Sequence, residues 1–364
     1  MQARPATHAG SWYSDSADTV RYQIDYWLNE AKGELKGVTP GLPVRGARII
    51  IAPHAGFAYS GRCAAYAYNA WDLKDAKRIF VLGPAHHVYY RTLALPVYTS
   101  YHTPLTAEAL PLDIDLISYL RTQKAVGPNQ EPIEFTTMTR ADDEDEHSLE
   151  LHLPFIHRML QLQFPDKSPS EYPPLVPIVV GALDEGTEQA FGKLLAPYLA
   201  SKENAFVISS DFCHWGTRFN YTYFTSAALS PGPIIPVSEG LPRPGLKEDN
   251  TTTLIERCQN GHDRTSTHTE IFSPPIYASI SALDLGAMAA IATGRYQEFS
   301  KYIRDTRNTV CGRHPIGVIM AAVESLGLAD TNLGRFHFIR YDRSSNVRVF
   351  KESSVSYASA YALM

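Results

Sequence analysis

The sequence predicts an α/β fold in which a mostly parallel central sheet is flanked by helices on both faces. Three observations support this prediction: short apolar strands, helices between them, and a different pattern in the C-terminal tail. The strand-like runs are rich in β-branched residues, as expected for strands that are buried on both faces. They are ARIIIA ending at Ala52, KRIFVL ending at Leu82, NAFVIS ending at Ser209, and PLVPIVVGAL around Val179.

Helical periodicity separates these strands. Val20, Ile24 and Leu28 share one helical face, and the polar run SDS ending at Ser16 precedes them as a source of candidate caps. GRCAAYAYNAW and TEQAFGKLLAPYLA have a similar apolar spacing. Strands that alternate with helices are typical of βαβ units, whose parallel sheet is covered on both sides.

The C-terminal tail, FHFIRYDRSSNVRVFKESSVSYASAYAL, has strand-like runs separated by the turn-like DRSSN. It predicts antiparallel strands added at a sheet edge. The segment 230–275 is rich in Pro, Gly, Thr and Asn without a sustained period, and we interpret it as a long loop insertion. A shorter insertion is expected near 120–139. We therefore expect residues 1–364 to form a single domain.

Composition narrows the class of protein. Apolar residues make up 44% and charged residues 20% of the 364 positions, as in ordinary globular proteins. The net charge of -5, without a long basic run, argues against nucleic acid as a partner. No stretch approaches the roughly 18 apolar residues of a membrane span, and the N-terminus lacks the apolar core of a signal peptide. We expect a cytoplasmic protein, with the nucleus as a further compartment.

Three predicted strands are each followed by a histidine. His54 comes after the first, His86 and His87 after the second, and Asp211 and His214 after the third. In an open parallel sheet, ligands bind in the crevice outside the carboxyl ends of the strands. A lone histidine there is more often a structural residue, but three together favour a shared site. Adjacent residues on an extended chain point to opposite faces, so we expect His86 rather than His87 to enter this site.

Cys311 lies in NTVCGRHPIGVIM, just before a helix-like pattern. A thiolate at a helix N-terminus near Arg313 and His314 would be favoured by the helix dipole and by positive charge. Such an environment suits a nucleophile or a soft metal ligand, whereas the alternative is a small buried hydrophobe. We adopt that alternative for Cys63 and Cys258.

A run of five acids, DDEDE, precedes His147 and a predicted helix. One interpretation is an acidic first turn that complements the helix dipole, with Asp145 or Ser148 as its cap. The other is that Glu144 and His147 face the crevice as outer members of the site. The sequence leaves both interpretations open.

His54, His86 and Cys311 together offer two imidazoles and one anionic ligand. Non-haem iron sites and catalytic zinc sites use ligand sets of this kind. A thiolate in place of a carboxylate suits softer or redox-active ions, so iron(II) and copper are predicted, with zinc as an alternative. His214 and Asp211 are then predicted to be acid/base residues near the metal but not bound to it.

At these motifs the sequence resembles the Memo family, the mediators of cell motility, which is similar in fold to class III extradiol ring-cleaving dioxygenases. The resemblance extends from about His8 to the C-terminus. It is carried by HAGSWY, IAPHAGFAYSG, GPAHHV, DEDEHSLELHLPF, SSDFCHWG, NTVCGRHPIG and SSVSYASAYAL.

The resemblance implies a single α/β domain with a metal-capable pocket. His54, His86 and Cys311 match the family's metal-site positions, while Asp211 and His214 match the acid/base region of the dioxygenases. Cys311 stands where the dioxygenases have a carboxylate, which argues against ring-opening activity. The family implies an iron- or copper-binding redox protein with roles in metal homeostasis, reactive oxygen or cell-motility signalling.

Two other functions are consistent with the sequence. The crevice could bind a small molecule. Alternatively, the protein could be a signalling adaptor whose crevice binds a peptide or phosphopeptide without turnover. A Cys-His hydrolase would use Cys311 as nucleophile and His214 or His314 as base. The clustering of several imidazoles favours the metal site over the hydrolase.

Overall fold

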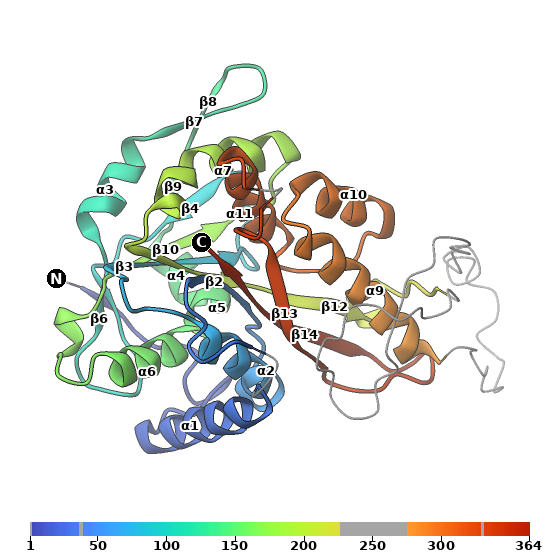
Figure 1. Cartoon of the computed structure of the whole chain (residues 1–364), viewed down its shortest axis with the longest axis horizontal. Helices are drawn as coiled ribbons and strands as arrows, with labels where there is room; N and C mark the ends of the chain where they lie inside the picture. The colour runs from blue at the N-terminus through green and yellow to red at the C-terminus, as the bar shows by residue number, and fades with distance from the viewer. Residues whose placement is uncertain (1, 36–38, 226–274, 329–330) are drawn as a thin grey trace.

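The computed structural model describes residues 2–35, 39–225, 275–328 and 331–364 (Figure 1). The predicted insertion at 230–275, apart from its last residue, lies outside the described residues, as does Cys258. No helix in the described part of the chain is long and apolar enough to cross a membrane.

A central sheet of nine strands organises the described residues. Its four middle strands are parallel neighbours in the order β2, β11, β3 and β10. Every residue of these strands is buried except Arg78, because helices cover both faces. They match the four predicted strands: β2 (Ala47–Ala52), β11 (Asn204–Ser209), β3 (Arg78–Pro84) and β10 (Leu175–Val180). The prediction of a mostly parallel α/β sheet is confirmed.

The sheet becomes antiparallel towards both ends. On one side, β4 (Leu93–Leu95) is antiparallel to β10 and parallel to β9 (Thr136–Thr137). On the other side, β13 (Phe336–Arg343) and β14 (Ser354–Leu363) form the predicted hairpin. Along its other edge, β14 pairs with β2 and with β12 (Asp211–Trp215). The C-terminal strand therefore connects the hairpin to β2, the first of the four central strands.

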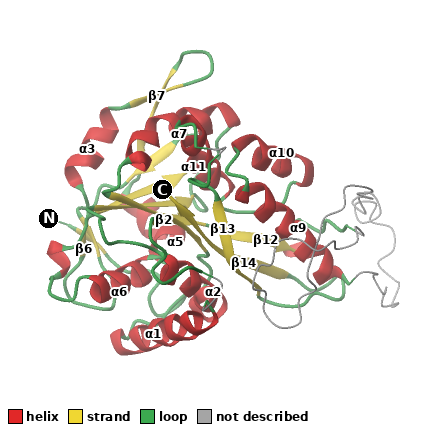
Figure 2. Ribbon diagram, in the orientation of Figure 1, coloured by secondary structure: helices red, strands yellow, loops and turns green. Residues whose placement is uncertain are grey.

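Helices lie on both faces of the sheet (Figure 2). One face carries α1 (Ala17–Glu34), α2 (Phe57–Ala70) and α6 (Leu153–Gln163), and the other carries α7 (Glu185–Ala200), α10 (Tyr296–Thr306) and α11 (Arg313–Ser325). Helix α1 begins after Ser16, whose hydroxyl accepts from the Thr19 amide at 3.4 Å. Val20 and Ile24 on the predicted apolar face are fully buried.

Shorter elements surround this framework. A small sheet combines β1 (Ala3–Arg4), β5 (Ser100–Tyr101) and β6 (Leu110–Pro111). The segment 120–139 contains β9 and the hairpin of β7 (Lys124–Val126) and β8 (Pro132–Glu134), which projects from the body of the molecule (Figure 1). In the described part of the chain, α9 (Ile276–Ala292) is a further long helix. The shorter helices there are α3 (Ile114–Thr122), α4 (Arg140–Asp145), α5 (His147–Glu150), and the 3₁₀ turns η1 (Pro169–Glu171) and η2 (Thr217–Phe219).

Two histidines of the core make stability depend on pH. The ring of His152 bonds to the Tyr68 hydroxyl at 2.9 Å, and burial lowers the pKa of His152 to about 3. The ring of His157 bonds to the Thr103 hydroxyl at 2.7 Å, and burial lowers the pKa of His157 to about 4. Both rings are therefore neutral in the folded protein at neutral pH.

We expect the unfolding free energy of the metal-free protein to fall as pH falls from about 6.5, the ordinary histidine pKa, towards 4. The unfolded chain binds protons in this range and the folded core does not, so each such histidine contributes about 1.4 kcal/mol per pH unit. Buried Asp143 opposes this trend, because burial raises the pKa of Asp143 to about 6. Urea unfolding of the wild type and of His152→Gln between pH 7 and 5 isolates the contribution of one histidine to the pH dependence of the unfolding free energy. Identical pH slopes in the two proteins would contradict the prediction.

Candidate metal centre

The carboxyl ends of three neighbouring strands form one edge of the site. Ala52 of β2 pairs with Ser209 of β11, and β3 runs in register on the other side of β11. His54 follows β2 and His86 follows β3, so the two rings converge over the end of β11, with their centroids 5.1 Å apart. The predicted convergence of these two histidines is present in the structure.

A third imidazole, that of His147, completes the cluster. One ring nitrogen from each of His54, His86 and His147 lies within 4.8 Å of the others. The rings of His86 and His147 stack with centroids 4.4 Å apart. His147 begins α5, which packs closely on β3: a Cβ at Gly83 would lie 2.6 Å from the Ser148 hydroxyl oxygen. One of the two interpretations of the sequence makes His147 an outer member of the site, whereas the structure places it inside the cluster.

Hydrogen bonds select the tautomer of His54. Its Nδ1 lies 2.6 Å from the Ser209 hydroxyl, and that hydroxyl donates its single hydrogen to the Ser148 carbonyl at 2.7 Å. Ser209 must therefore accept from His54, so Nδ1 carries the proton. In the neutral ring, Nε2 is left with a free lone pair, which is the state that binds metals.

Glu146 orients His86 in the same way. The carboxylate accepts from the His86 amide at 2.6 Å, from the His86 Nδ1 at 2.9 Å and from the Ser148 amide at 2.9 Å. Burial opposes the ionisation of Glu146, but the hydrogen bonds and attraction to His86 outweigh it and lower the pKa of Glu146 to about 2. A carboxylate behind a histidine is a recurrent support of metal ligands.

Two imidazoles of the cluster, those of His54 and His147, hold their lone pairs at neutral pH. Burial lowers the pKa of His54 well below its usual value, and the neighbouring histidines lower it further. Burial and the proximity of His86 lower the pKa of His147 to about 3. Nδ1 of His147 is buried without a hydrogen-bond partner and stays 3.6 Å from the Glu146 carboxylate.

Cys311 lies at the edge of the cluster. Its Sγ is 3.3 Å from Nε2 of His54 and accepts from the Asp211 amide at 3.1 Å. Gly312 permits this approach, since a Cβ there would lie 2.4 Å from the Ser209 carbonyl oxygen. The start of α11 is thereby held against the end of β11.

The predicted stabilisation of the Cys311 thiolate is wrong. Burial raises the pKa of this thiol well above its usual value, and the Asp211 carboxylate raises it further. The Arg313 guanidinium, which was expected to favour the thiolate, contacts the ring of His314 instead. A protonated thiol is a poor nucleophile, so the structure argues against a Cys-His hydrolase.

Asp211 and His214 lie on β12, beyond the end of β11. The Asp211 carboxylate accepts from the amides of His54 at 2.9 Å and Ala55 at 3.3 Å, so it fixes the turn that carries His54. Burial raises the pKa of Asp211. Nδ1 of His214 faces the carbonyls of Phe212 at 2.9 Å and Thr309 at 3.2 Å, which can only accept. The proton of a neutral His214 ring is therefore on Nδ1, and Nε2 can accept another.

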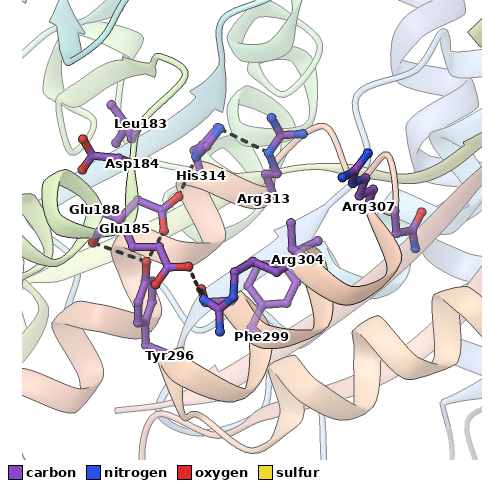
Figure 3. A pocket seen from close by; sticks show the side chains of 13 residues that line it. Leu183, Asp184, Glu185, Glu188, Tyr296, Phe299, Arg304, Arg307, Arg313 and His314 are labelled. Atoms are coloured by element: carbon purple, nitrogen blue, oxygen red, sulfur yellow. Dashed lines mark hydrogen bonds and ion pairs between the residues drawn. The ribbon is translucent and has the colours of Figure 1, made fainter. Parts of the chain in front are cut away.

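The other predicted members lie further out. The His87 ring is 5.9 Å from that of His147 and its residue is exposed. Glu144 accepts from the Tyr98 hydroxyl. Nδ1 of His314 donates to the Glu188 carboxylate at 2.5 Å, and His314 lines a different cavity together with Arg313 (Figure 3).

Trp12 and Glu146 are functional candidates that the sequence alone did not reveal. The Trp12 ring packs against the His147 ring at an interplanar angle of 33° with centroids 4.3 Å apart, and Trp12 is 38% exposed, so it forms an aromatic rim. Trp12 stands in HAGSWY far from the strand ends, and Glu146 is one of five acids in a row. Only the position of Glu146 directly before His147 distinguished it from its neighbours.

Comparison with known proteins identifies the family of this chain. The family model of the Memo-like protein matches residues 4–361. Protein MEMO1 of Xenopus tropicalis is 38% identical over 98% of this chain and 95% of its own length. Protein MEMO1 of Homo sapiens is 37% identical over the same shares of both chains, and a MEMO1 family protein of Schizosaccharomyces pombe is 36% identical over 99% and 98%. The chain therefore belongs to the Memo-like protein family.

Proposed function

We propose that this chain is an iron- or copper-binding redox protein whose ion is held by His54, His86 and Cys311, with His147 as an additional imidazole donor. The strongest support for this proposal is a pair of hydrogen bonds. Nδ1 of His54 bonds to the Ser209 hydroxyl, and Nδ1 of His86 bonds to the Glu146 carboxylate. Both rings are left with Nε2 as a lone-pair donor.

The chemistry of the donors fits such an ion. Neutral imidazoles and a thiolate suit iron, copper and zinc better than calcium or magnesium, which prefer oxygen ligands. The orphaned, buried Nδ1 of His147 is a polar atom that a ligand role would satisfy. A bound iron or copper ion would supply one-electron chemistry.

The protein's own groups would position reactants and protons. His214 could accept a proton at Nε2, since its Nδ1 is committed to backbone carbonyls. Asp211 would hold the His54 turn in place. By family resemblance, we place this activity in the cytoplasm, in metal homeostasis, reactive oxygen or cell-motility signalling, without ring cleavage.

Metal analysis tests the proposal. Wild type, His54→Ala, His147→Ala and Cys311→Ala would be purified without chelator, loaded anaerobically with iron(II) or with copper, and assayed by mass spectrometry. We expect His54→Ala and Cys311→Ala to lose more than about tenfold in affinity. His337→Ala, an exposed histidine on β13, is the control and should bind as wild type does. Equal binding by all five proteins would sink the proposal.

Metal affinity should also rise with pH. Cys311 is protonated in the metal-free protein, so binding releases one proton and affinity increases about tenfold per pH unit below the thiol pKa. His54 and His147 add no slope at neutral pH, because they are already neutral. Chelator competition from pH 6.5 to 8.5 measures the slope. A Cys311→Ala protein that keeps the wild-type slope would show that the thiol is not the ligand.

One observation favours a second candidate function. The exposed Trp12 ring beside His147 offers an aromatic surface at the rim, which suits a peptide or phosphopeptide adaptor that uses the same pocket. Peptide capture that is abolished by Trp12→Ala but unaffected by removal of the metal would favour the adaptor.

A further inference from the structure

Glu150 supports His8 in the way that Glu146 supports His86. The Glu150 carboxylate accepts from the His8 amide at 2.8 Å and from Nδ1 of His8 at 2.9 Å. Glu146 accepts from the same two groups of His86. Helix α5 begins directly after Glu146 and ends at Glu150, so the two carboxylates flank His147 in sequence. The chain thus contains two histidines that are each oriented by a buried carboxylate.

The Glu150 carboxylate fixes the tautomer of His8. Burial opposes the ionisation of Glu150, but hydrogen bonds from His8 and attraction to Arg4 lower the pKa of Glu150 to about 2. An ionised carboxylate can only accept, so Nδ1 of a neutral His8 ring carries the proton and Nε2 holds a lone pair. In the described part of the chain this Nε2 forms no hydrogen bond, and it is not buried. Histidines that bind metals usually donate their other N–H to such a carboxylate.

A structural role does not account for the open nitrogen of His8. Glu150 also accepts from Arg4 at 2.6 Å and from the Tyr13 hydroxyl at 2.9 Å. The charge of this carboxylate is therefore balanced without His8. The side chain of His8 is 13% exposed, so a ligand can reach its ring.

His8 lies beside the candidate metal centre. Its ring centroid is 6.0 Å from that of His147 and 5.9 Å from that of Trp12. A bond between a metal ion and an imidazole nitrogen is about 2 Å long, so two rings that hold one ion have centroids no more than roughly 6.5 Å apart. The separation of His8 and His147 is within this limit. His8 is nevertheless not one of the three described histidines whose ligand atoms lie within 4.8 Å of one another. Its position suits an ion outside that cluster.

We propose that His8 and His147 form an outer metal subsite, which holds an iron or copper ion on its way to and from the proposed centre. Nε2 of His8 and the ring of His147 each displace one water from the incoming hydrated ion. His147 keeps its bond while the inner ligands replace His8, so the ion is not released between the two positions. This inference rests on the proposed metal-binding function, because the outer subsite leads to that centre.

Iron(II) exchange kinetics under anaerobic conditions test this assignment. Ferrozine, a chelator that turns purple with iron(II), is added at intervals to measure uptake, and in excess to the loaded protein to measure release. We expect His8→Ala to slow uptake and release by the same factor, about tenfold, while the dissociation constant stays within about twofold of wild type. The two rates change together because the outer subsite lowers the barrier between the free and the bound ion without changing either end state.

Tyr13→Phe is the matched control. It removes another neutral donor to Glu150 but no imidazole, so it should exchange iron(II) as the wild type does. Added free imidazole should restore part of the lost rate to His8→Ala.

Wild-type exchange rates in His8→Ala, or an equal slowing in Tyr13→Phe, would overturn the outer subsite. A large loss of equilibrium affinity in His8→Ala would also overturn it, since His8 would then be a permanent ligand. These outcomes leave the proposed centre intact. Failure of the wild type to bind iron(II) or copper would instead overturn the proposed function, and the outer subsite with it.

Discussion

An Arg4→Ala variant is expected to lose about 3–5 kcal/mol of unfolding free energy. Arg4 is 1% exposed, and its guanidinium contacts the Asp143 carboxylate at 2.9 Å and the Glu150 carboxylate at 2.6 Å. Removing it leaves both carboxylates buried without their cation. Burial opposes the ionisation of Glu150, but hydrogen bonds from His8 and Arg4 hold the pKa of Glu150 at about 2, so this group stays charged.

Urea unfolding at pH 7 measures this loss, with Arg21→Ala as the control. Arg21 also pairs with an aspartate, Asp18, but that carboxylate is 93% exposed, and exposed pairs contribute little. A small, similar loss in both variants would contradict the prediction. The same guanidinium donates to the carbonyls of Asp143, Glu144 and Glu146, so Arg4 also fixes the backbone that presents His147.

A Glu146→Gln variant is expected to bind the metal about 10–100-fold more weakly while remaining folded. The carboxylate accepts three hydrogen bonds, from the two His86 donors and the Ser148 amide. The amide group of glutamine has the same shape, but one of its two ends is a donor. One oxygen accepts from both Nδ1 of His86 and the Ser148 amide, so the glutamine NH2 would face the His86 amide. The backbone that presents the His86 ring would lose this hydrogen bond, and Nδ1 would lose its charged acceptor.

Chelator competition at pH 7.5 measures this affinity, and circular dichroism checks the fold. Glu144→Gln is the matched control, because Glu144 lies two residues earlier and bonds to Tyr98 instead. Equal affinity of the Glu146 and Glu144 variants would show that the carboxylate does not support the site.

The strand framework and the two strand-end histidines could be predicted from sequence because each depends on local pattern. ARIIIA and RIFVL are apolar without alternation, which indicates strands covered on both faces. The carboxyl ends of parallel strands share one edge, so the convergence of His54 and His86 follows from the strand type alone.

The acidic run shows why the rest of the site could not be predicted. Helix α4 ends at Asp145, and Glu146 adopts an extended backbone before α5 begins at His147. This break resets the helical phase, so periodicity could not tell which acid faces His86. The direction of the pKa shift of Cys311 could not be predicted from sequence either, because it depends on burial and on Asp211, which is 100 residues away in sequence.

The contact between Cys311 and His54 joins residues 257 positions apart. The imidazoles come from the first half of the chain, whereas the thiol arrives only with α11, and β14 follows later to close the sheet against β2. During synthesis the histidines would therefore be present well before the thiol, and contacts of such long sequence separation form late. A thiolate-dependent absorption band of the bound ion would then report that the C-terminal segment has docked.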